Sequence, residues 1–485
     1  MAPSWYYQKP PSWKTRDANR ARAAVSTTPP PPFGALIRTL KLRHLDDEGE
    51  TLDHLARITD LQTVASYSWV DKPNSGPEIL IPVRQKMNLT KDVSPGRPPL
   101  WTPQVTPTQL KEDSGQYYRD KNAARYPRHP IEPAVVAGLD ADPALPLDLD
   151  IFACKSTLGS LLSFVRGEDK EFRMLAYKVR HTIFLVRREN SPTELIPDVR
   201  GYGHTFPEAN TTWEADVKGS ASHQRLIRYV FGGLRLAVRF EADGYIKPSG
   251  GGGGEDDDFD PNLRSNRLSS SPASFSTSTT TTARQTKLTV TQAGPTVPIP
   301  HRALFDLKTR SVRTREAKGG GAAVVEEELP RLWAAQLPTL VLAYHARGLF
   351  RPEEVEVRDV RADLRRWERE HRAELARLAA LLRRLMRDLV AVADEEEAVA
   401  VAAGLEIRRP GGEVAGVLSD EVLQRWMSAA GDEGDSDDDD HDDHFTAYGE
   451  AGGWESDWES EDDREYLDFT ACSADDCGYC GRCPY

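Results

Sequence analysis

Apolar residues recur along this chain with two periods, one typical of helices and one of strands. Helical spacing of three and four residues predicts five helices, at 52–61, 150–166, 220–230, 332–344 and about 362–392. Ser156 or Thr157 is expected to cap the second helix. Gly232 and Gly233 supply the stop signal expected after the third.

The predicted helix at 362–392 carries an apolar stripe formed by Leu375, Leu378, Leu382 and Leu385. We expect this stripe to pack on the sheet of the same chain. A helix of a partner protein is the alternative.

Alternating or continuous apolar patterns predict strands at 35–40, 182–186, 234–243, 303–309 and 355–357. Alternate residues of a strand face the same side, so Glu241 and Asp243 should share one face, as should Asp306 and Lys308. Because strands and helices are interspersed, the sequence predicts one mixed α/β (α+β) core, a central sheet flanked by helices.

Composition separates this core from segments that bury too little apolar surface to fold, since the 485 residues include 35 Gly, 34 Pro and 28% charged residues. The expected order is a disordered Pro-rich arm (1–33), N-terminal strands with a wrapping segment (34–146), the core (147–247 and 300–395), a disordered low-complexity insertion (248–299), an extension of the core (396–429), an acidic disordered tail (430–470) and a Cys-rich terminus (471–485).

The net charge of −14 is concentrated near the C-terminus, where residues 432–465 hold seventeen Asp or Glu and one Arg. The remainder is close to neutral, and its basic stretches could meet a polyanion for which the acidic tail competes. A disordered tail that only solubilises the protein is the favoured interpretation.

Apolar runs are all shorter than the roughly 18 to 20 residues of a membrane helix, and the first residues lack the apolar segment of a secretory signal. We therefore expect an intracellular protein, in the nucleus or cytoplasm, with no membrane partner.

Charged residues at the ends of two predicted strands suggest chemistry. Glu241 and Asp243 close one strand, and Asp306 and Lys308 lie on the next strand of the core. Hard cations such as Mg²⁺ or Mn²⁺ prefer carboxylate oxygens, waters and substrate phosphate. A metal there would stabilise charge on a phosphate and activate a water, while Lys308 would orient that water or neutralise developing charge. This set of groups suits phosphodiester hydrolysis.

The order of these elements resembles the PD-(D/E)XK nuclease fold, and the motifs resemble the eukaryotic decapping and exoribonuclease family that acts on aberrant RNA 5′ ends. The similar stretches are Gly203–Glu208, Glu241–Asp243, Asp306–Thr309 and Trp333 with Gln336, within about 150–247 and 300–360. The resemblance implies metal ligation by Glu208, Glu241, Asp243 and Asp306, with Lys308 and Gln336 near the attacking water. The chain departs from the family pattern by having Asp at 306 and by the additional Pro207 before Glu208.

The predicted function is a divalent-metal nuclease acting on nucleic acid, with RNA 5′-end processing the favoured form. The alternative is an inactive nuclease-like core that binds RNA, with its tails contacting an RNA-processing partner. Tyr202, His204, Trp213 and Arg239 are candidate nucleic-acid contacts, because aromatic rings can stack on bases. Simple packing of such residues is the competing interpretation.

Four cysteines crowd the C-terminus: Cys472, Cys477, Cys480 and Cys483. Their spacing suits tetrahedral Zn²⁺ binding. Absence of any metal remains open, as does an iron–sulfur cluster that joins Cys154 to three tail cysteines, which resembles the cysteine pattern of certain nucleases of this fold.

Two other patterns are expected to carry no chemistry. Glu214-Ala215-Asp216-Val217-Lys218 contains both acidic spacings but lies before a predicted helix, so we interpret it as a helix-entry segment. The sequence is also similar to uncharacterised fungal proteins sometimes labelled geranylgeranyl pyrophosphate synthetase. That chemistry needs paired Asp-rich motifs on facing helices, whereas the Asp runs here lie at 255–260 and 437–443, so we reject the label.

Overall fold

The computed structural model describes residues 33–71, 76–82, 97–168, 171–196, 199–247, 287–293, 299–390, 398–401, 406–410 and 417–429. Within these residues the chain forms two mixed sheets and ten helices. The predicted mixed α/β core is therefore confirmed. The Asp runs, the acidic tail and the four tail cysteines all lie outside the described residues.

The larger sheet has eleven strands, several of them far apart in the sequence. In spatial order they are β1 (Phe33–Thr39), β18 (Glu406–Pro410), β17 (Ala398–Val401), β7 (Arg173–Val179), β8 (Thr182–Arg187), β6 (Ile151–Cys154), β11 (Leu234–Glu241), β10 (Ser220–Phe231), β2 (Thr59–Val70), β3 (Glu78–Pro82) and β13 (Thr289–Ala293). β6 runs parallel to both β8 and β11.

The smaller sheet has seven strands. In spatial order they are β5 (Thr108–Gln109), β16 (Leu349–Asp359), β15 (Thr339–Ala346), β14 (Leu304–Ser311), β12 (Gly244–Tyr245), β4 (Leu100–Trp101) and β9 (Thr211–Thr212). β14 runs parallel to β15 and antiparallel to β12.

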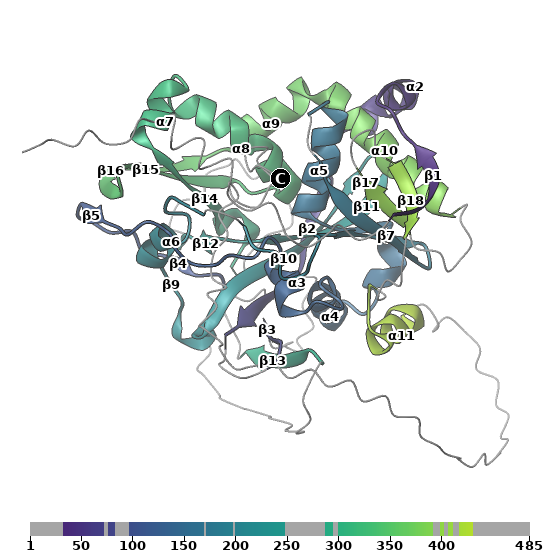
Figure 1. The fold of residues 1–485 in the computed structure, drawn as a ribbon, viewed down its shortest axis with the longest axis horizontal. Helices are drawn as coiled ribbons and strands as arrows, with labels where there is room; N and C mark the ends of the chain where they lie inside the picture. The colour runs from purple at the N-terminus through teal and green to yellow at the C-terminus, as the bar shows by residue number, and fades with distance from the viewer. Residues whose placement is uncertain are drawn as a thin grey trace, which may run out of the picture.

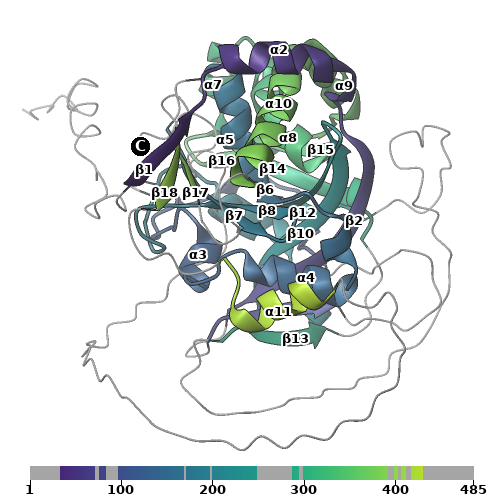
Figure 2. The same cartoon turned by 90° about the vertical axis from the view of Figure 1, so that its right-hand side faces the viewer.

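Helices cover both faces of the larger sheet (Figures 1 and 2). The helices are α2 (Arg43–Leu52), α3 (Lys121–Arg125), α4 (Glu132–Ala141), α5 (Lys155–Val165), α6 (Thr205–Asn210), α7 (Val312–Ala317), α8 (Gly321–Ala335), α9 (Arg361–Glu370), α10 (Arg372–Val390) and α11 (Asp420–Ser428). One apolar core lies beneath α2, α5, α8, α9 and α10, and a second lies between the opposite face and α4 with α11. No helix of the described residues is long and apolar enough to cross a membrane.

The segment 220–230, predicted to be a helix, is instead the central strand β10, and this prediction was wrong. β10 pairs with β11 on one side and β2 on the other, and nearly all its residues are buried. A strand covered on both faces loses the alternation that identifies exposed strands. Gly232 and Gly233 both have positive φ, 62° and 71°, as a tight two-residue hairpin requires.

Other predicted boundaries also change. The helix expected at 52–61 lies earlier, as α2, and is followed by the start of β2. Residues 151–154 of the expected second helix form β6, so α5 begins at Lys155 with Cys154 as its N-cap and Thr157 completing the capping box. β13 is a further difference, because it is a strand inside the stretch predicted to be a disordered insertion.

The long C-terminal helix is divided at His371 into α9 and α10. Leu375, Leu378, Leu382 and Leu385 are buried as predicted. They lie on α10, which packs against α2 and α5 and shares one apolar core with residues of the larger sheet. The predicted helix at 332–344 ends at Ala335, because Pro338 follows and the chain then enters β15.

The chain passes from the larger sheet into the smaller one immediately after β11. Ala242 and Asp243 form the link, and Gly244 begins β12 beside β14. A Cβ atom at Gly244 would lie only 2.4 Å from the Phe305 ring and 2.8 Å from the Pro99 carbonyl oxygen, so only glycine permits this approach. The crossing brings the end of β11 next to the middle of β14.

Candidate active site

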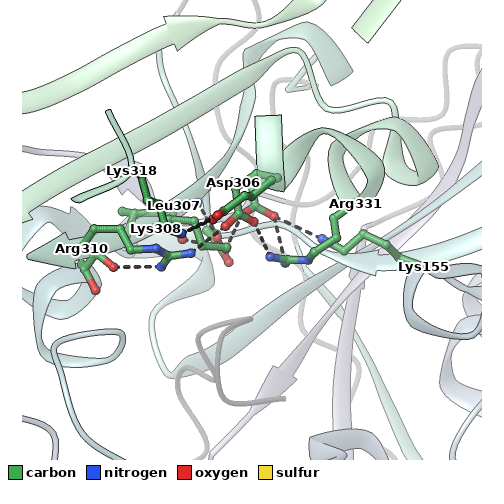
Figure 3. Close-up of polar contacts among 11 residues, drawn as sticks. Lys155, Asp306, Leu307, Lys308, Arg310, Lys318 and Arg331 are labelled. Carbon is green, nitrogen blue, oxygen red and sulfur yellow. Dashed lines mark hydrogen bonds and ion pairs between the residues drawn. The ribbon is translucent and has the colours of Figure 1, made fainter. Parts of the chain in front are cut away.

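The crossing between the sheets brings three of the predicted site residues together. The backbone N–H of Leu307 on β14 donates to Asp243 Oδ2 at 2.7 Å. On either side of Leu307, Asp306 and Lys308 point to the same side of β14, and the Lys308 ammonium donates to Asp306 Oδ1 and to the Leu307 carbonyl oxygen at 2.9 Å. The predicted shared face of Asp306 and Lys308 is thus observed (Figure 3).

Asp306 is surrounded by three cations. Lys308 holds Oδ1, while Lys155 Nζ lies 3.2 Å and Arg331 Nη2 3.7 Å from Oδ2. Figure 3 shows Lys155 and Arg331 approaching the carboxylate from the side opposite Lys308. The Asp306 side chain is only 4% exposed and that of Lys308 2%.

Arg331 is itself oriented by a buried carboxylate. Glu328, one turn earlier on α8, accepts from Arg331 Nη1 at 2.8 Å through Oε2. Its Oε1 accepts from Arg310 Nη2 of β14 at 2.7 Å. The guanidinium of Arg331 therefore bridges Glu328 and Asp306, as its planar array of donors allows.

Glu241 lies at the edge of this cluster and is more accessible, with 31% of its side chain exposed. Its Oε1 accepts from Lys121 Nζ at 3.0 Å, and its Oε2 accepts from Gln224 Nε2 at 3.4 Å. Lys121 is positioned by α3, a short helix whose N-cap, Asp120, accepts from two backbone N–H groups.

The two central carboxyl groups have opposite electrostatic surroundings. Burial, followed by the negative charge of Asp306, raises the pKa of Asp243 to about 6. Burial acts in the same direction on Asp306, but Lys308, Lys155 and Arg331 hold the pKa of Asp306 well below its usual range. Burial would lower the pKa of Lys308, yet Asp306 raises it, so Lys308 is charged.

Two residues implied by the family resemblance lie on helices rather than on the strands that form the crossing. Gln336 is the buried C-cap of α8, with φ of 53°, and its Nε2 donates to the Trp333 carbonyl oxygen of its own helix at 2.7 Å. Its side chain is thus oriented toward the helix end. Glu208 lies on α6 and is exposed, and the principal charged neighbours of Asp243 are Asp306, Lys308 and Glu241.

Three of the four candidate nucleic-acid contacts are buried. His204 bonds Asp113 Oδ2 at 2.9 Å and stacks on Tyr117 with ring centroids 3.5 Å apart. Tyr202 packs edge-on against His345 and Phe350. Arg239 donates to Cys154 Sγ at 3.0 Å. These residues stabilise the core in this structure, whereas Trp213 is partly exposed between β9 and the 3₁₀ helix at Ala215–Val217.

The carboxylates of Asp243 and Asp306 are the oxygen ligands that this cluster offers to a divalent cation. Among residues whose placement is described, no group of three or more His, Cys, Asp or Glu side chains is arranged to hold a metal ion. Mg²⁺, however, is commonly bound by one or two carboxylates with waters and substrate phosphate. Asp243 and Asp306 offer hard oxygen ligands of that kind, so they fit an ion that arrives with its substrate rather than a preformed cage.

Lys121, Lys155, Glu328 and Arg331 were not found by sequence reasoning. A signal for Lys155 existed, because parallel β6 and β11 end at the same edge of the sheet and Lys155 directly follows β6. Taking residues 150–154 as helix concealed it. The other three come from α3 and α8, and no local pattern reveals that these helices face the cluster.

Comparison with known proteins places most of the chain in one family. The family model described as "Domain of unknown function (DUF8563)" matches residues 84–408. A search of curated proteins finds no match.

Solved structures similar to this chain include two Rai1 proteins and a Dxo1 protein. Rai1 of Scheffersomyces stipitis, in complex with (3′-NADP)+ and calcium ion, has a TM-score of 0.46 at 12% identity, covering 82% of this chain and 99% of that chain. Rai1 of Candida albicans, in complex with pU5-Mn2+, has a TM-score of 0.44 at 9% identity, covering 77% of this chain and 96% of that chain. Dxo1 of K. lactis, in complex with manganese, has a TM-score of 0.40 at 8% identity, covering 80% of this chain and 97% of that chain.

Proposed function

We propose that this chain, which belongs to the DUF8563 family, binds nucleic acid at the cluster of Glu241, Asp243, Asp306 and Lys308 and hydrolyses phosphodiester bonds there with a divalent cation. The observation that carries the proposal is the convergence of Asp243, Asp306 and Lys308 from two strands that meet where the sheets cross. Burial, followed by the negative charge of Asp306, raises the pKa of Asp243 to about 6, and perturbed pKa values of this kind gather at functional sites.

Each residue would have a distinct role. Asp243 and Asp306 would hold the cation, which when bound stabilises charge on the phosphate and lowers the pKa of an attacking water. Lys308, fixed by Asp306 and the Leu307 carbonyl oxygen, would orient the water or neutralise developing charge. Glu241 is accessible enough to bind the cation through water. Glu208 and Gln336 are not included, since neither belongs to the cluster.

RNA is the first substrate to test, with 5′-end processing as the favoured form. This choice comes from the motif resemblance to the decapping and exoribonuclease family. It also agrees with the uridine oligonucleotide named with Candida albicans Rai1.

The test is cleavage of end-labelled single-stranded RNA and DNA by the full chain with Mn²⁺. Asp243→Asn should abolish cleavage, while Glu214→Gln, which changes an acid in an identical Glu-Ala-Asp tripeptide elsewhere, should leave it intact. Equal cleavage by both variants would indicate a contaminating nuclease and contradict the proposal. No cleavage of either substrate by the wild type would also contradict it.

A second candidate is a non-catalytic nucleic-acid-binding protein, with a protein partner contacted through the tails. The observation favouring it is that cations of the protein already pair with two of the carboxylates, Glu241 with Lys121, and Asp306 with Lys155, Lys308 and Arg331. Equal binding of RNA by wild type and Asp243→Asn in EDTA, with no cleavage under any metal condition, would support this candidate. Zn²⁺ at the four tail cysteines remains a separate proposal, which metal analysis of reduced protein would test.

A further inference from the structure

Asp306 Oδ2 is one of the carboxylate oxygens proposed to bind the divalent cation, and cations of the protein already hold it. Lys155 Nζ lies 3.2 Å from it and Arg331 Nη2 lies 3.7 Å from it. A divalent ion that bound this oxygen would come within a few ångströms of two positive charges. Like charges repel, and the repulsion between a divalent ion and each of these cations is twice that between two unit charges at the same distance.

These two cations are also more accessible than the carboxylate that they hold. Lys155 is 16% exposed and Arg331 13%, against 4% for Asp306 itself. A phosphate group that approached the cluster would therefore meet Lys155 and Arg331 before it met the carboxylate. Both side chains suit phosphate: arginine through its planar donors and lysine as a point charge.

The geometry of Arg331 allows it to change partners without losing its support. Glu328 holds Nη1 at 2.8 Å and is held in turn by Arg310, so this end of the guanidinium is fixed by a buried ion pair. The Nη2 end lies 3.7 Å from Asp306 Oδ2, an ion-pair distance longer than an ordinary hydrogen bond. Rotation about the Glu328 contact would transfer Nη2 from Asp306 to a neighbouring anion.

We propose that Lys155 and Arg331 form an exchangeable counterion pair, which holds Asp306 Oδ2 when nucleic acid is absent and transfers to a substrate phosphate when it binds. The transfer frees Asp306 Oδ2 for the divalent cation. The inference rests on the proposed function of this site. It adds that the cation and the nucleic-acid phosphate bind with positive cooperativity, and that the site disfavours metal in the absence of substrate.

Cooperativity of this kind is reciprocal, because each ligand must raise the affinity of the other by the same factor. Removing one cation of the pair should mimic the effect of substrate on the metal. Arg331→Met and Lys155→Met should therefore bind metal more tightly than the wild type when nucleic acid is absent. Glu328→Gln should have the opposite effect, because Arg331 would lose its competing carboxylate and pair more closely with Asp306.

The experiment is a titration of Mn²⁺ into metal-free full-length protein without nucleic acid, with free Mn²⁺ followed by its electron paramagnetic resonance signal. We expect Arg331→Met and Lys155→Met to bind Mn²⁺ about tenfold more tightly than wild type, within the range usual for coupled sites. Glu328→Gln should bind more weakly. The matched control is Lys318→Met, which removes the same charge from an ion pair with Glu327 near the start of α8. Its Mn²⁺ affinity should equal that of wild type.

A second measurement reads the coupling from the nucleic-acid side. Fluorescence anisotropy of a labelled ten-nucleotide oligouridylate, measured in EDTA and in Ca²⁺, should show a gain in affinity with Ca²⁺ for wild type. The gain should be smaller in Arg331→Met and Lys155→Met. Circular dichroism establishes that each variant is folded.

The outcomes separate this inference from the proposed function. If folded Arg331→Met and Lys155→Met bind Mn²⁺ no more tightly than wild type, the counterion exchange is wrong, although a metal-dependent nuclease would stand. If Glu328→Gln strengthens Mn²⁺ binding, the partner change of Arg331 is wrong. If no protein binds Mn²⁺, with or without the oligonucleotide, both the exchange and the metal-dependent function are wrong.

Discussion

The tripeptide Glu-Ala-Asp occurs twice in this chain, at 214–216 and at 241–243, in very different surroundings. The first forms part of a 3₁₀ helix ahead of β10. Glu214 accepts from Tyr245 Oη at 2.5 Å and pairs with Arg97 at 3.0 Å, and Asp216 lies 3.5 Å from the same arginine. Its predicted role as a helix-entry segment was wrong, because the element that follows is a strand.

The second tripeptide ends β11 and leads into the crossing between the sheets. Glu241 and Asp243 bind groups from different elements, Lys121 of α3 and the Leu307 N–H of β14. Arg97 and Lys247 balance charge in the first copy and Tyr245 donates a hydrogen bond to Glu214, whereas in the second copy Asp243 meets another carboxyl group. The spacing of the two acids alone therefore does not bring carboxyl groups together. In the second copy, the neighbouring strand β14 supplies the other carboxyl group, Asp306.

The largest expected difference between the two copies is in catalysis. Asp243→Asn should reduce Mn²⁺-dependent cleavage of single-stranded RNA by about a thousandfold, since loss of a metal ligand removes several kcal/mol of transition-state stabilisation. Glu214→Gln should change the rate less than twofold. Single-turnover cleavage rates of the two variants measure this, and comparable losses would show that the crossing is not the catalytic site.

The next largest effect concerns stability at Asp306. Asp306→Asn leaves Lys308, Lys155 and Arg331 without their carboxylate, which should cost about 3 to 5 kcal/mol of unfolding free energy at pH 7. Because the pKa of Asp306 is lowered in the folded protein, its contribution is present above the ordinary carboxyl pKa and is lost as pH falls. Urea unfolding of wild type and variant at pH 7 tests this, and a cost below 1 kcal/mol would contradict the ion-pair network.

Asp243→Asn should have the opposite sign. The pKa of Asp243 is raised from 3.8 to about 6, so folding favours its protonated form and the protein loses stability as pH rises from about 4 to 6. The neutral amide should stabilise the protein at pH 7 by at most about 3 kcal/mol, an effect that fades below pH 4. Urea unfolding at pH 4 and pH 7.5 gives both values. If Asp243→Asn destabilised the protein at pH 7.5, the raised pKa of Asp243 would be contradicted.

The smallest effect belongs to the first tripeptide. Glu214→Gln removes a partly exposed pair with Arg97 and should cost no more than about 1 kcal/mol. The cost should shrink at high salt, whereas that of Asp306→Asn should not. Unfolding of both variants in 0.1 and 1 M NaCl measures the contrast. A salt-independent cost at Glu214 would place that pair in the core.

The sequence by itself determined where Glu241 and Asp306 lie along their strands, whereas Asp243, predicted on the same strand as Glu241, lies in the link after it. Alternation in 234–241 and 304–309 placed Glu241 at a strand end and put Asp306 and Lys308 on one face, because the period of two is a local property of the backbone. The buried leucines of α10 were identified for the same reason, since their spacing depends only on the helical repeat.

Tertiary structure alone decided which groups those carboxylates meet. Lys155, Arg331 and Lys121 come from α5, α8 and α3, and only sheet order and helix packing bring them to the crossing. Gln336 could not be placed from its motif because its side chain follows the end of α8, and β10 was mistaken because a strand buried on both faces has no alternation. A local pattern encodes the direction of a side chain, whereas its partners depend on pairings between segments far apart in the chain.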